Sequence, residues 1–255
     1  MSVEDRFRLD GRVAIVTGAS SGLGAQFARV LHAVGARVVL VARRRERLEA
    51  LAGELDGASV CAVDLAEAGA AEQVVEHARD AFGRVDVLVN NAGITTVAPA
   101  LDESPESFAD TLRVNLMAPF ALACAAARTM LDSDAGGSIV NVASILGLVG
   151  VGQIPQAGYA ASKGGLVNLT RELAAQWARR GVRVNAIAPG WFPSEMTEGR
   201  MFGDERAERW MRNRTPMGRG GAIDELDGAL LFLAGDMSTF VTGQVIAVDG
   251  GWVSV

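Results

Sequence analysis

Short apolar runs alternate along this chain with longer segments of helical periodicity, and this alternation limits the folds that are open to it. The apolar runs, our predicted strands, are Arg12–Thr17, Arg37–Val41, Ala58–Val63, Val85–Val89, Ser138–Val142, Arg183–Ile187 and Val245–Val248. Runs without polar alternation are typical of strands that are buried on both faces of a parallel sheet. The segments between them, our predicted helices, are Ala25–Val34, Arg43–Leu55, Ala70–Phe82, Pro105–Leu131, Gln156–Arg180 and Ile223–Ala234. The alternation predicts an α/β fold, a doubly wound parallel sheet with helices on both faces.

The 255 residues are long enough for one large domain of this Rossmann-like type, and no Pro/Ser-rich linker or internal repeat divides them. We therefore predict a single dinucleotide-binding and catalytic domain over residues 1–255. The stretch at about 190–221 has a different composition, and we expect a substrate lid with one or two short helices. Its large apolar residues form a substrate pocket or simply pack the lid, and they are Trp191, Phe192, Met196, Met201, Phe202, Trp210 and Met211.

Charge and hydropathy argue against two classes of partner. The net charge is −6, and no basic patch with interleaved aromatic residues occurs, so we expect no nucleic-acid binding. The longest apolar run, Met117–Ala127, contains Pro119 and is about half the ~20 residues that span a bilayer, so we expect no membrane insertion. The first residues lack the basic-then-apolar order of a secretory signal, which predicts a cytoplasmic protein.

The chain has two cysteines and two histidines, and neither pair suggests a functional site. Cys61 and Cys124 lie in apolar surroundings, which predicts buried free thiols in a reducing compartment. His32 and His77 fall within helical patterns and match no metal-ligand spacing. We therefore predict no metal site.

The first predicted strand runs into a glycine-rich turn, Thr17–Gly24, which opens a helix. A strand before the turn and a helix after it are the context that a dinucleotide-binding fingerprint requires. Glycines let backbone N–H groups approach a pyrophosphate, and the helix N-terminus adds partial positive charge. A plain turn is the alternative interpretation. The residues of this turn that we expect at the cofactor are Gly18, Ser20, Ser21, Gly22 and Leu23.

The end of the second predicted strand indicates which dinucleotide binds. A site for NAD usually places Asp or Glu there for the ribose 2′-hydroxyl, but this chain has Ala42 followed by Arg43, Arg44 and Arg45. An arginine can bind a 2′-phosphate through its planar fork, so we predict NADP(H) with Arg43 and Arg44 as ligands. Arginine at a helix N-terminus also requires a compensating anion. A solvated helix start is the alternative, and it leaves NAD(H) possible.

Polar residues also follow the third and fourth predicted strands. Asp64, next to Leu65, either accepts a hydrogen bond from the adenine amino group or caps a turn. Asn91, Ala92 and Gly93 follow the fourth strand. Ligands of such sheets bind in the crevice outside the carboxyl ends of the strands, so we assign all five residues to the cofactor site.

The single tyrosine and the single lysine of the chain lie four residues apart, at Tyr159 and Lys163. The other 23 basic residues are arginines, which indicates that Lys163 lies at a site where an arginine cannot replace it. The i,i+4 spacing places both side chains on one helix face. An ammonium favours the phenolate and should lower the pKa of the tyrosine toward neutral pH, so the phenol can give a proton to a carbonyl oxygen or take one from an alcohol. Two ordinary surface residues are the alternative.

Three motifs now resemble the short-chain dehydrogenase/reductase family over nearly the whole chain: Tyr-x-x-x-Lys, Thr-Gly-x-x-x-Gly-x-Gly and Asn-Asn-Ala-Gly. The resemblance implies a catalytic tetrad of Asn115, Ser144, Tyr159 and Lys163. In such enzymes the serine polarises the substrate oxygen, the lysine also grips the cofactor ribose, and the asparagine holds a water in a proton relay. Tyr159 and Lys163 are therefore expected to contact the cofactor as well.

The resemblance extends to the C-terminal third. Pro189, Gly190, Phe192 and Ser194 are similar to the family's segment beside the nicotinamide, with serine in place of the common threonine. The ending Asp249–Gly251 is similar to a family segment that packs at a subunit interface, which implies a homotetramer.

The function that these motifs imply is reversible NADP(H)-dependent hydride transfer between a secondary alcohol and a ketone. An NAD(H)-preferring polyol or sugar-acid dehydrogenase is the alternative, and a non-catalytic dinucleotide-sensing regulator is the competing class. The pattern resembles both 3-oxoacyl-thioester reductases and gluconate-type dehydrogenases, so the small-molecule substrate stays open. An acidic acyl carrier would need a basic patch, which the following residues supply unless they are only solvated helix faces: Arg179, Arg180, Arg206, Arg209, Arg212 and Arg214.

Overall fold

The computed structural model describes residues 2–133 and 136–255. Their sheet has seven strands in the order β3-β2-β1-β4-β5-β6-β7, and every neighbouring pair is parallel. The strands are β1 (Val13–Thr17), β2 (Arg37–Ala42), β3 (Ser59–Ala62), β4 (Val87–Asn90), β5 (Gly137–Val142), β6 (Val182–Pro189) and β7 (Val245–Val248). The predicted doubly wound parallel sheet is confirmed.

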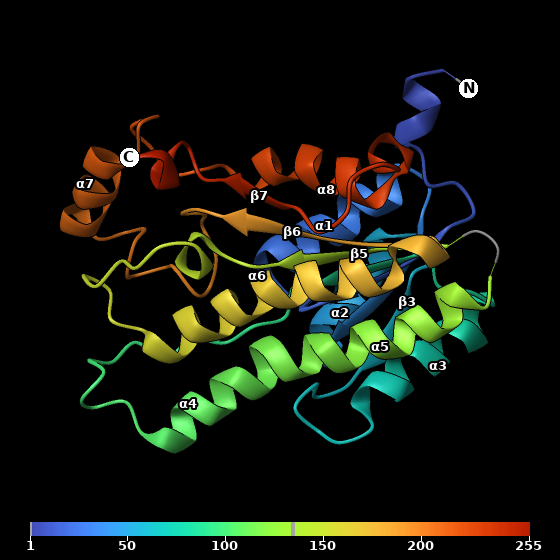
Figure 1. Ribbon diagram of the computed structural model, residues 1–255, viewed down its shortest axis with the longest axis horizontal. Helices are drawn as coiled ribbons and strands as arrows, with labels where there is room; N and C mark the ends of the chain where they lie inside the picture. The colour runs from blue at the N-terminus through green and yellow to red at the C-terminus, as the bar shows by residue number, and fades with distance from the viewer. Residues whose placement is uncertain (1, 134–135) are drawn as a thin grey trace.

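Helices cover both faces of the sheet (Figure 1). One face carries α1 (Gly22–Ala33), α2 (Arg45–Glu54) and α8 (Asp227–Ala234), and the other carries α3 (Ala70–Phe82), α5 (Ala118–Leu131) and α6 (Ala157–Trp177). Strand β1 shows why both faces are apolar. Ala14 and Val16 pack in the core cluster that contains Phe27 of α1, whereas Val13 and Ile15 point into the cluster on the opposite face.

The order of the strands reverses between β1 and β4, which are neighbours although β2 and β3 lie between them in the chain. The connections after these two strands leave toward opposite faces, and this opens a crevice at their carboxyl ends. The glycine-rich turn follows β1, and Asn91 follows β4. The two motifs predicted to bind the cofactor are therefore adjacent in space.

The predicted helix over Pro105–Leu131 is interrupted. It consists of α4 (Pro105–Leu112), a π-helical turn at Arg113–Met117, and α5. The π turn contains Asn115, whose side chain bonds to the loop after β4. Isolated π turns in α-helices often mark functional positions. Periodicity cannot predict such a turn, because the contacts that hold it come from elsewhere in the fold.

Among the described residues, the continuous helical stretch Pro105–Leu131 is the one that could cross a membrane by length and composition. It has 27 residues, and its most apolar window has a mean hydropathy of 1.4. Of that window, 50% is buried inside the protein, and Leu122 and Met130 of α5 lie in the core cluster beside α3. Core helices of globular domains satisfy the same criteria.

The predicted lid segment, residues 190–221, contains one helix, α7 (Glu205–Arg214). The segment packs through Trp191 and Trp210, whose ring centroids lie 5.4 and 5.2 Å from that of Trp252 near the C-terminus in edge-to-face contacts. Met201 and Met211 are buried in the same cluster. Most of the large apolar residues of this segment therefore pack against protein.

Gly24 and Gly53 give a matched test of the helix packing at the cofactor turn. A Cβ on Gly24 would lie 2.2 Å from the carbonyl oxygen of Gly18 and 2.6 Å from Nδ2 of Asn91, whereas a Cβ on Gly53 of α2 meets nothing within 4 Å. Gly24→Ala should lower the free energy of unfolding by about 1–3 kcal/mol or more through overpacking. Gly53→Ala should raise it by up to ~1 kcal/mol through helix propensity. Urea denaturation of both variants measures the difference, and equal effects would contradict the close packing.

Candidate active site

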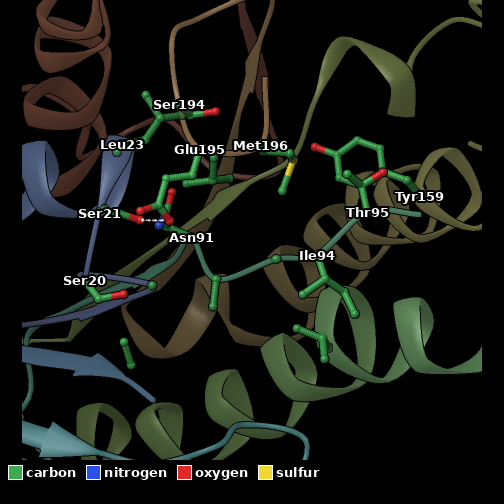
Figure 2. Close-up of a pocket in the computed structure, with 18 of the residues that line it drawn as sticks. Ser20, Ser21, Leu23, Asn91, Ile94, Thr95, Tyr159, Ser194, Glu195 and Met196 are labelled. Carbon is green, nitrogen blue, oxygen red and sulfur yellow. Dashed lines mark hydrogen bonds between the residues drawn. The ribbon is translucent and has the colours of Figure 1, made fainter. Parts of the chain in front are cut away.

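A cavity of about 900 Å³ opens at the carboxyl edge of the sheet, between the strand ends and the start of the predicted lid (Figure 2). Every residue predicted for the cofactor or for catalysis lines this cavity except Asn115. The predicted residues in its wall are Gly18, Ser20, Ser21, Gly22, Leu23, Arg43, Arg44, Asp64, Leu65, Asn91, Ala92, Gly93, Ser144, Tyr159, Lys163, Pro189, Gly190, Phe192 and Ser194. Of the seven large apolar residues in the predicted lid, Phe192 and Met196 also line the cavity.

Thr17 joins the two cofactor motifs, a role that the sequence analysis missed. Its hydroxyl accepts hydrogen bonds from the backbone N–H groups of Asn91 (2.9 Å) and Ala92 (3.0 Å). In return, Nδ2 of Asn91 donates to the carbonyl oxygen of Thr17 at 2.9 Å. These bonds fix the end of β1 to the end of β4, so the floor of the cavity is rigid where a pyrophosphate would lie.

Three side chains meet at the other end of the cavity. Tyr159 lies in the first turn of α6 and is half-buried. Ser144 is 6% exposed and accepts a hydrogen bond from the N–H of Leu146 at 3.2 Å, which starts a short 3₁₀ turn. Lys163 is 3% exposed; its Nζ donates to the carbonyl oxygen of Val142 at 2.7 Å and lies 5.6 Å from the centre of the Tyr159 ring. The arrangement can hold a substrate oxygen beside a phenol and a hydroxyl.

Burial controls the ionisation of this group. It raises the pKa of Tyr159, and the neighbouring Ser144 hydroxyl offsets only part of that rise. Burial also lowers the pKa of Lys163 from 10.5 to about 8. The sequence predicted that the ammonium would lower the pKa of Tyr159, and for the protein alone this direction is wrong. Burial removes solvation from the phenolate, and this desolvation is the largest cause of the raised pKa.

Asn115 lies behind the cavity wall and is fully buried. Its Nδ2 donates to the carbonyl oxygen of Ile94 (2.8 Å) and to Oγ of Ser162 (3.0 Å), and its Oδ1 accepts from the N–H of Ile94 (2.8 Å). Ser162 in turn donates to the backbone oxygen of Tyr159 at 2.7 Å. Asn115 therefore fixes the loop after β4 against the first turns of α6.

Glu103 is a further residue near the site that the sequence analysis missed. Its Oε2 accepts the N–H of Gly158 at 3.1 Å, one residue before Tyr159. A carboxylate stabilises a helix N-terminus through the unpaired N–H groups and the dipole. Carboxylates are found at many helix N-termini, but Glu103 is distant from α6 in the sequence, so only the fold reveals this contact.

At the end of β2, the two predicted arginines have different partners. Arg44 donates to Oγ of Ser20 at 2.9 Å and to Oγ of Ser21 at 2.8 Å. Arg43 forms an ion pair with Asp64, at 3.6 Å. Asp64 also accepts the N–H of Ala66 at 3.0 Å, so its carboxylate makes the turn contact that was one of the two interpretations offered for it.

A carboxylate from the predicted lid lies on the Arg44 side chain. Oε1 of Glu195 accepts from Arg44 at 3.2 Å and from Arg47. Its Oε2 accepts from the Ser21 hydroxyl at 3.1 Å (Figure 2). Hydrogen bonds from Arg47, Arg44 and Ser21 lower the pKa of Glu195 to about 2. We call Ser20, Ser21, Arg44 and Arg47 the anion site. Its donors suit an anionic group, and three of its four residues bind the Glu195 carboxylate.

Neither Arg47 nor Glu195 was predicted as a site residue from the sequence. The missed signal for Arg47 is its position three residues after Arg44, which caps α2, so that both guanidinium groups lie at the start of this helix. Glu195 had no local signal, because its partners are some 150 residues earlier in the chain. The anion that the arginine-rich helix start required is thus supplied by the protein itself.

Comparison with known proteins decides the family. The family model described as enoyl-(acyl carrier protein) reductase matches residues 18–253. The chain belongs to the short-chain dehydrogenase/reductase family. It is therefore an oxidoreductase that acts on alcohols and ketones.

Individual members of the short-chain dehydrogenase/reductase family match over nearly their full length. Gluconate 5-dehydrogenase of Gluconobacter oxydans (strain 621H) is 41% identical over 256 residues, 98% of each chain. The 3-oxoacyl-acyl-carrier-protein reductase FabG of Thermotoga maritima is 38% identical over 250 residues, 96% of this chain and 99% of that protein. The crystal structure of a gluconate 5-dehydrogenase from Burkholderia cenocepacia J2315, in complex with NADP and tartrate, has a TM-score of 0.94 and 38% identity over 100% of both chains.

The arginines considered for carrier docking do not gather at the cavity of this short-chain dehydrogenase. Arg179 and Arg180 follow α6, about 30 Å along the helix from Tyr159, at the opposite edge of the sheet. The arginines of α7 are exposed and line no part of the cavity, and Arg214 lies over the Trp252 ring at 5.2 Å. Both groups therefore behave as solvated helix faces.

The lowered pKa of Lys163 predicts a pH dependence of stability. Between pH 8 and 10.5 the unfolded chain binds more protons at this lysine than the folded chain, so its contribution raises the free energy of unfolding as pH rises. The slope is at most about 1.4 kcal/mol per pH unit. Lys163→Met removes this contribution, so the stability of wild type relative to the variant should increase from pH 8 to 9.5. Urea denaturation of both proteins measures it, and titrations common to both cancel. A constant difference would contradict the lowered pKa.

Proposed function

We propose that this protein catalyses reversible NADP(H)-dependent hydride transfer between a secondary alcohol and a ketone, with Tyr159 as general acid and base. The observation that carries the proposal is one cavity with two chemically distinct ends. Tyr159, Ser144 and Lys163 line one end, and Ser20, Ser21 and Arg44 of the anion site line the other. A dinucleotide that extends along this cavity would have its nicotinamide at the phenol and its adenosine ribose at the anion site.

The nicotinamide, when bound, supplies or accepts the hydride. In the reductive direction Tyr159 gives its phenolic proton to the carbonyl oxygen as the hydride reaches the carbonyl carbon, so the product is a neutral alcohol. The hydroxyl of Ser144 donates a hydrogen bond to the same oxygen and stabilises the charge that develops on it. In the oxidative direction the phenolate takes the proton of the alcohol. The raised pKa of Tyr159 keeps the phenol protonated at neutral pH, which favours proton donation.

Lys163 and Asn115 support this proton transfer. The ammonium of Lys163, beside the Tyr159 ring, stabilises the phenolate that forms when the proton leaves. Its short bond to the Val142 carbonyl holds it in place, and we expect its other N–H donors to bind the cofactor ribose. Asn115 fixes the backbone around Ile94 and α6, and we propose that this wall carries the water through which the proton reaches solvent.

The anion site supports NADP(H) rather than NAD(H). Ala42 ends β2 without a carboxylate for a 2′-hydroxyl, and the donors of Arg44 converge with two serine hydroxyls. A related gluconate 5-dehydrogenase was crystallised with NADP. We propose that Arg44 is the principal ligand of the 2′-phosphate and that Arg43, with Asp64, borders the adenine.

We propose a small free substrate rather than one delivered by an acyl carrier. The relatives include both gluconate 5-dehydrogenase and a 3-oxoacyl reductase, but the arginines considered for carrier docking, which follow α6 or belong to α7, do not line the cavity. Thr95 and Arg200 line the cavity and give it polar character. We further propose a cytoplasmic homotetramer that binds neither nucleic acid nor membrane.

Tyr159→Phe tests the catalytic assignment. The phenylalanine cannot transfer a proton, so kcat should fall by at least about a hundredfold. NADPH binding, measured by fluorescence titration, should stay within about threefold because the cofactor's phosphate contacts are intact. The assay is a panel of ketones, 3-oxoacyl thioesters, polyols and sugar acids. A variant with near-normal turnover would refute the role of Tyr159. A wild-type protein that binds NADPH but turns over nothing in the panel would favour a dinucleotide-sensing regulator.

Arg44→Ala tests the cofactor assignment. Loss of a guanidinium–phosphate contact should weaken NADPH binding by about ten- to a hundredfold. NADH lacks the phosphate, so its dissociation constant should change by less than about threefold. Equal loss for both cofactors, or a wild-type preference for NADH, would refute the assignment of Arg44.

A further inference from the structure

Glu195 occupies a position that a cofactor phosphate would otherwise use. Its carboxylate receives hydrogen bonds from Arg44, Arg47 and Ser21, three of the four residues of the anion site. Arg44 also makes ion-pair contact with the second oxygen, Oε2, at 3.0 Å. One carboxylate thus uses both arginines and one serine of the site.

The contact joins two separate parts of the cavity. Glu195 follows β6 in the predicted lid, whereas its partners belong to the glycine-rich turn and to α2. The adjacent Ser194 packs close to the same turn, since a Cβ on Gly22 would lie 3.5 Å from the Cβ of Ser194. The start of the predicted lid is therefore joined to the turn by the Ser21 hydrogen bond and to the start of α2 by ion pairs with Arg44 and Arg47.

We propose that the carboxylate of Glu195 occupies the 2′-phosphate position in the cofactor-free enzyme, is displaced when NADP(H) binds, and so limits the enzyme's preference for NADP(H) over NAD(H). The inference rests on the proposed role of Arg44 as the 2′-phosphate ligand. NAD(H) has a hydroxyl in place of the phosphate and needs no exchange of anions at Arg44.

Two physical arguments support a displacement. The donors that bind Glu195 are those that a phosphate would need, and a donor in use for one anion is not free for another. A phosphate dianion and a carboxylate at the same two guanidinium groups also repel each other. Glu195 is ionised throughout the neutral range, because its donors hold its pKa at about 2. The exchange therefore opposes NADP(H) binding under all ordinary assay conditions.

Glu198 provides a matched control in the same segment. It lines the same cavity and carries the same charge, but its side chain has no hydrogen bond or ion pair within the described part of the chain. Glu195→Gln and Glu198→Gln thus make the same change in net charge, and only the first removes an anion from Arg44 and Arg47.

The experiment measures dissociation constants of NADPH and NADH by tryptophan-fluorescence titration of wild type, Glu195→Gln and Glu198→Gln, without substrate. For Glu195→Gln we expect NADPH to bind about 3- to 10-fold more tightly, the range expected when two exposed ion pairs cease to compete. NADH binding should be unchanged in this variant. Glu198→Gln should leave both constants within about twofold of wild type.

Three outcomes would overturn the proposal. Unchanged NADPH binding in Glu195→Gln would mean that the contact is a surface ion pair without effect on the cofactor. Weaker NADPH binding would mean that Glu195 positions the two arginines for the cofactor. Equally tighter binding of both cofactors would mean that Glu195 holds the segment in a position that opposes either dinucleotide. Failure of the proposed function is distinguishable, because Arg44→Ala would then affect NADPH and NADH equally, whatever Glu195→Gln does.

Discussion

All seven strands run in one direction, and the arrangement of the active site depends on this constraint. Parallel strands end at the same edge of the sheet, so the residues that follow β1, β4, β5 and β6 meet there. The hydroxyl of Thr17 fixes two of these ends through bonds to the backbone of Asn91 and Ala92. This link adds to the pairing of β1 with β4 and positions the glycine-rich turn beside the Asn-Asn-Ala-Gly segment.

A buried ammonium is the second constraint on the site. Lys163 is 3% exposed although it lines the cavity, and its Nζ has one backbone oxygen, that of Val142, as a hydrogen-bond acceptor among the described residues. Gly147 permits this close packing, because a Cβ there would lie 2.7 Å from the backbone carbonyl of Lys163. The site thus retains a charge that burial disfavours, as expected where a proton must move at neutral pH.

The two ends of the cavity differ in how they handle charge. At the phenol, burial raises the pKa of Tyr159 and lowers that of Lys163, so both groups are held closer to neutrality than in water. At the anion site, exposed guanidinium groups hold Glu195 fully ionised. A dinucleotide matches this polarity, because its phosphates are anionic and its nicotinamide reacts in a poorly solvated environment.

The sequence by itself determined the fold class, a doubly wound parallel sheet, and it indicated the cofactor motifs and the proton-transfer pair, because each depends on local pattern. Apolar runs separated by helices specify a parallel sheet, and the spacing of Tyr159 and Lys163 puts them on one helix face. Only the tertiary structure decided what depends on contacts between distant segments. These are the π turn at Asn115, the direction of the Tyr159 pKa, and the Glu195 carboxylate on Arg44 and Arg47. Burial and long-range hydrogen bonds are properties of the packed chain, and no local pattern encodes them.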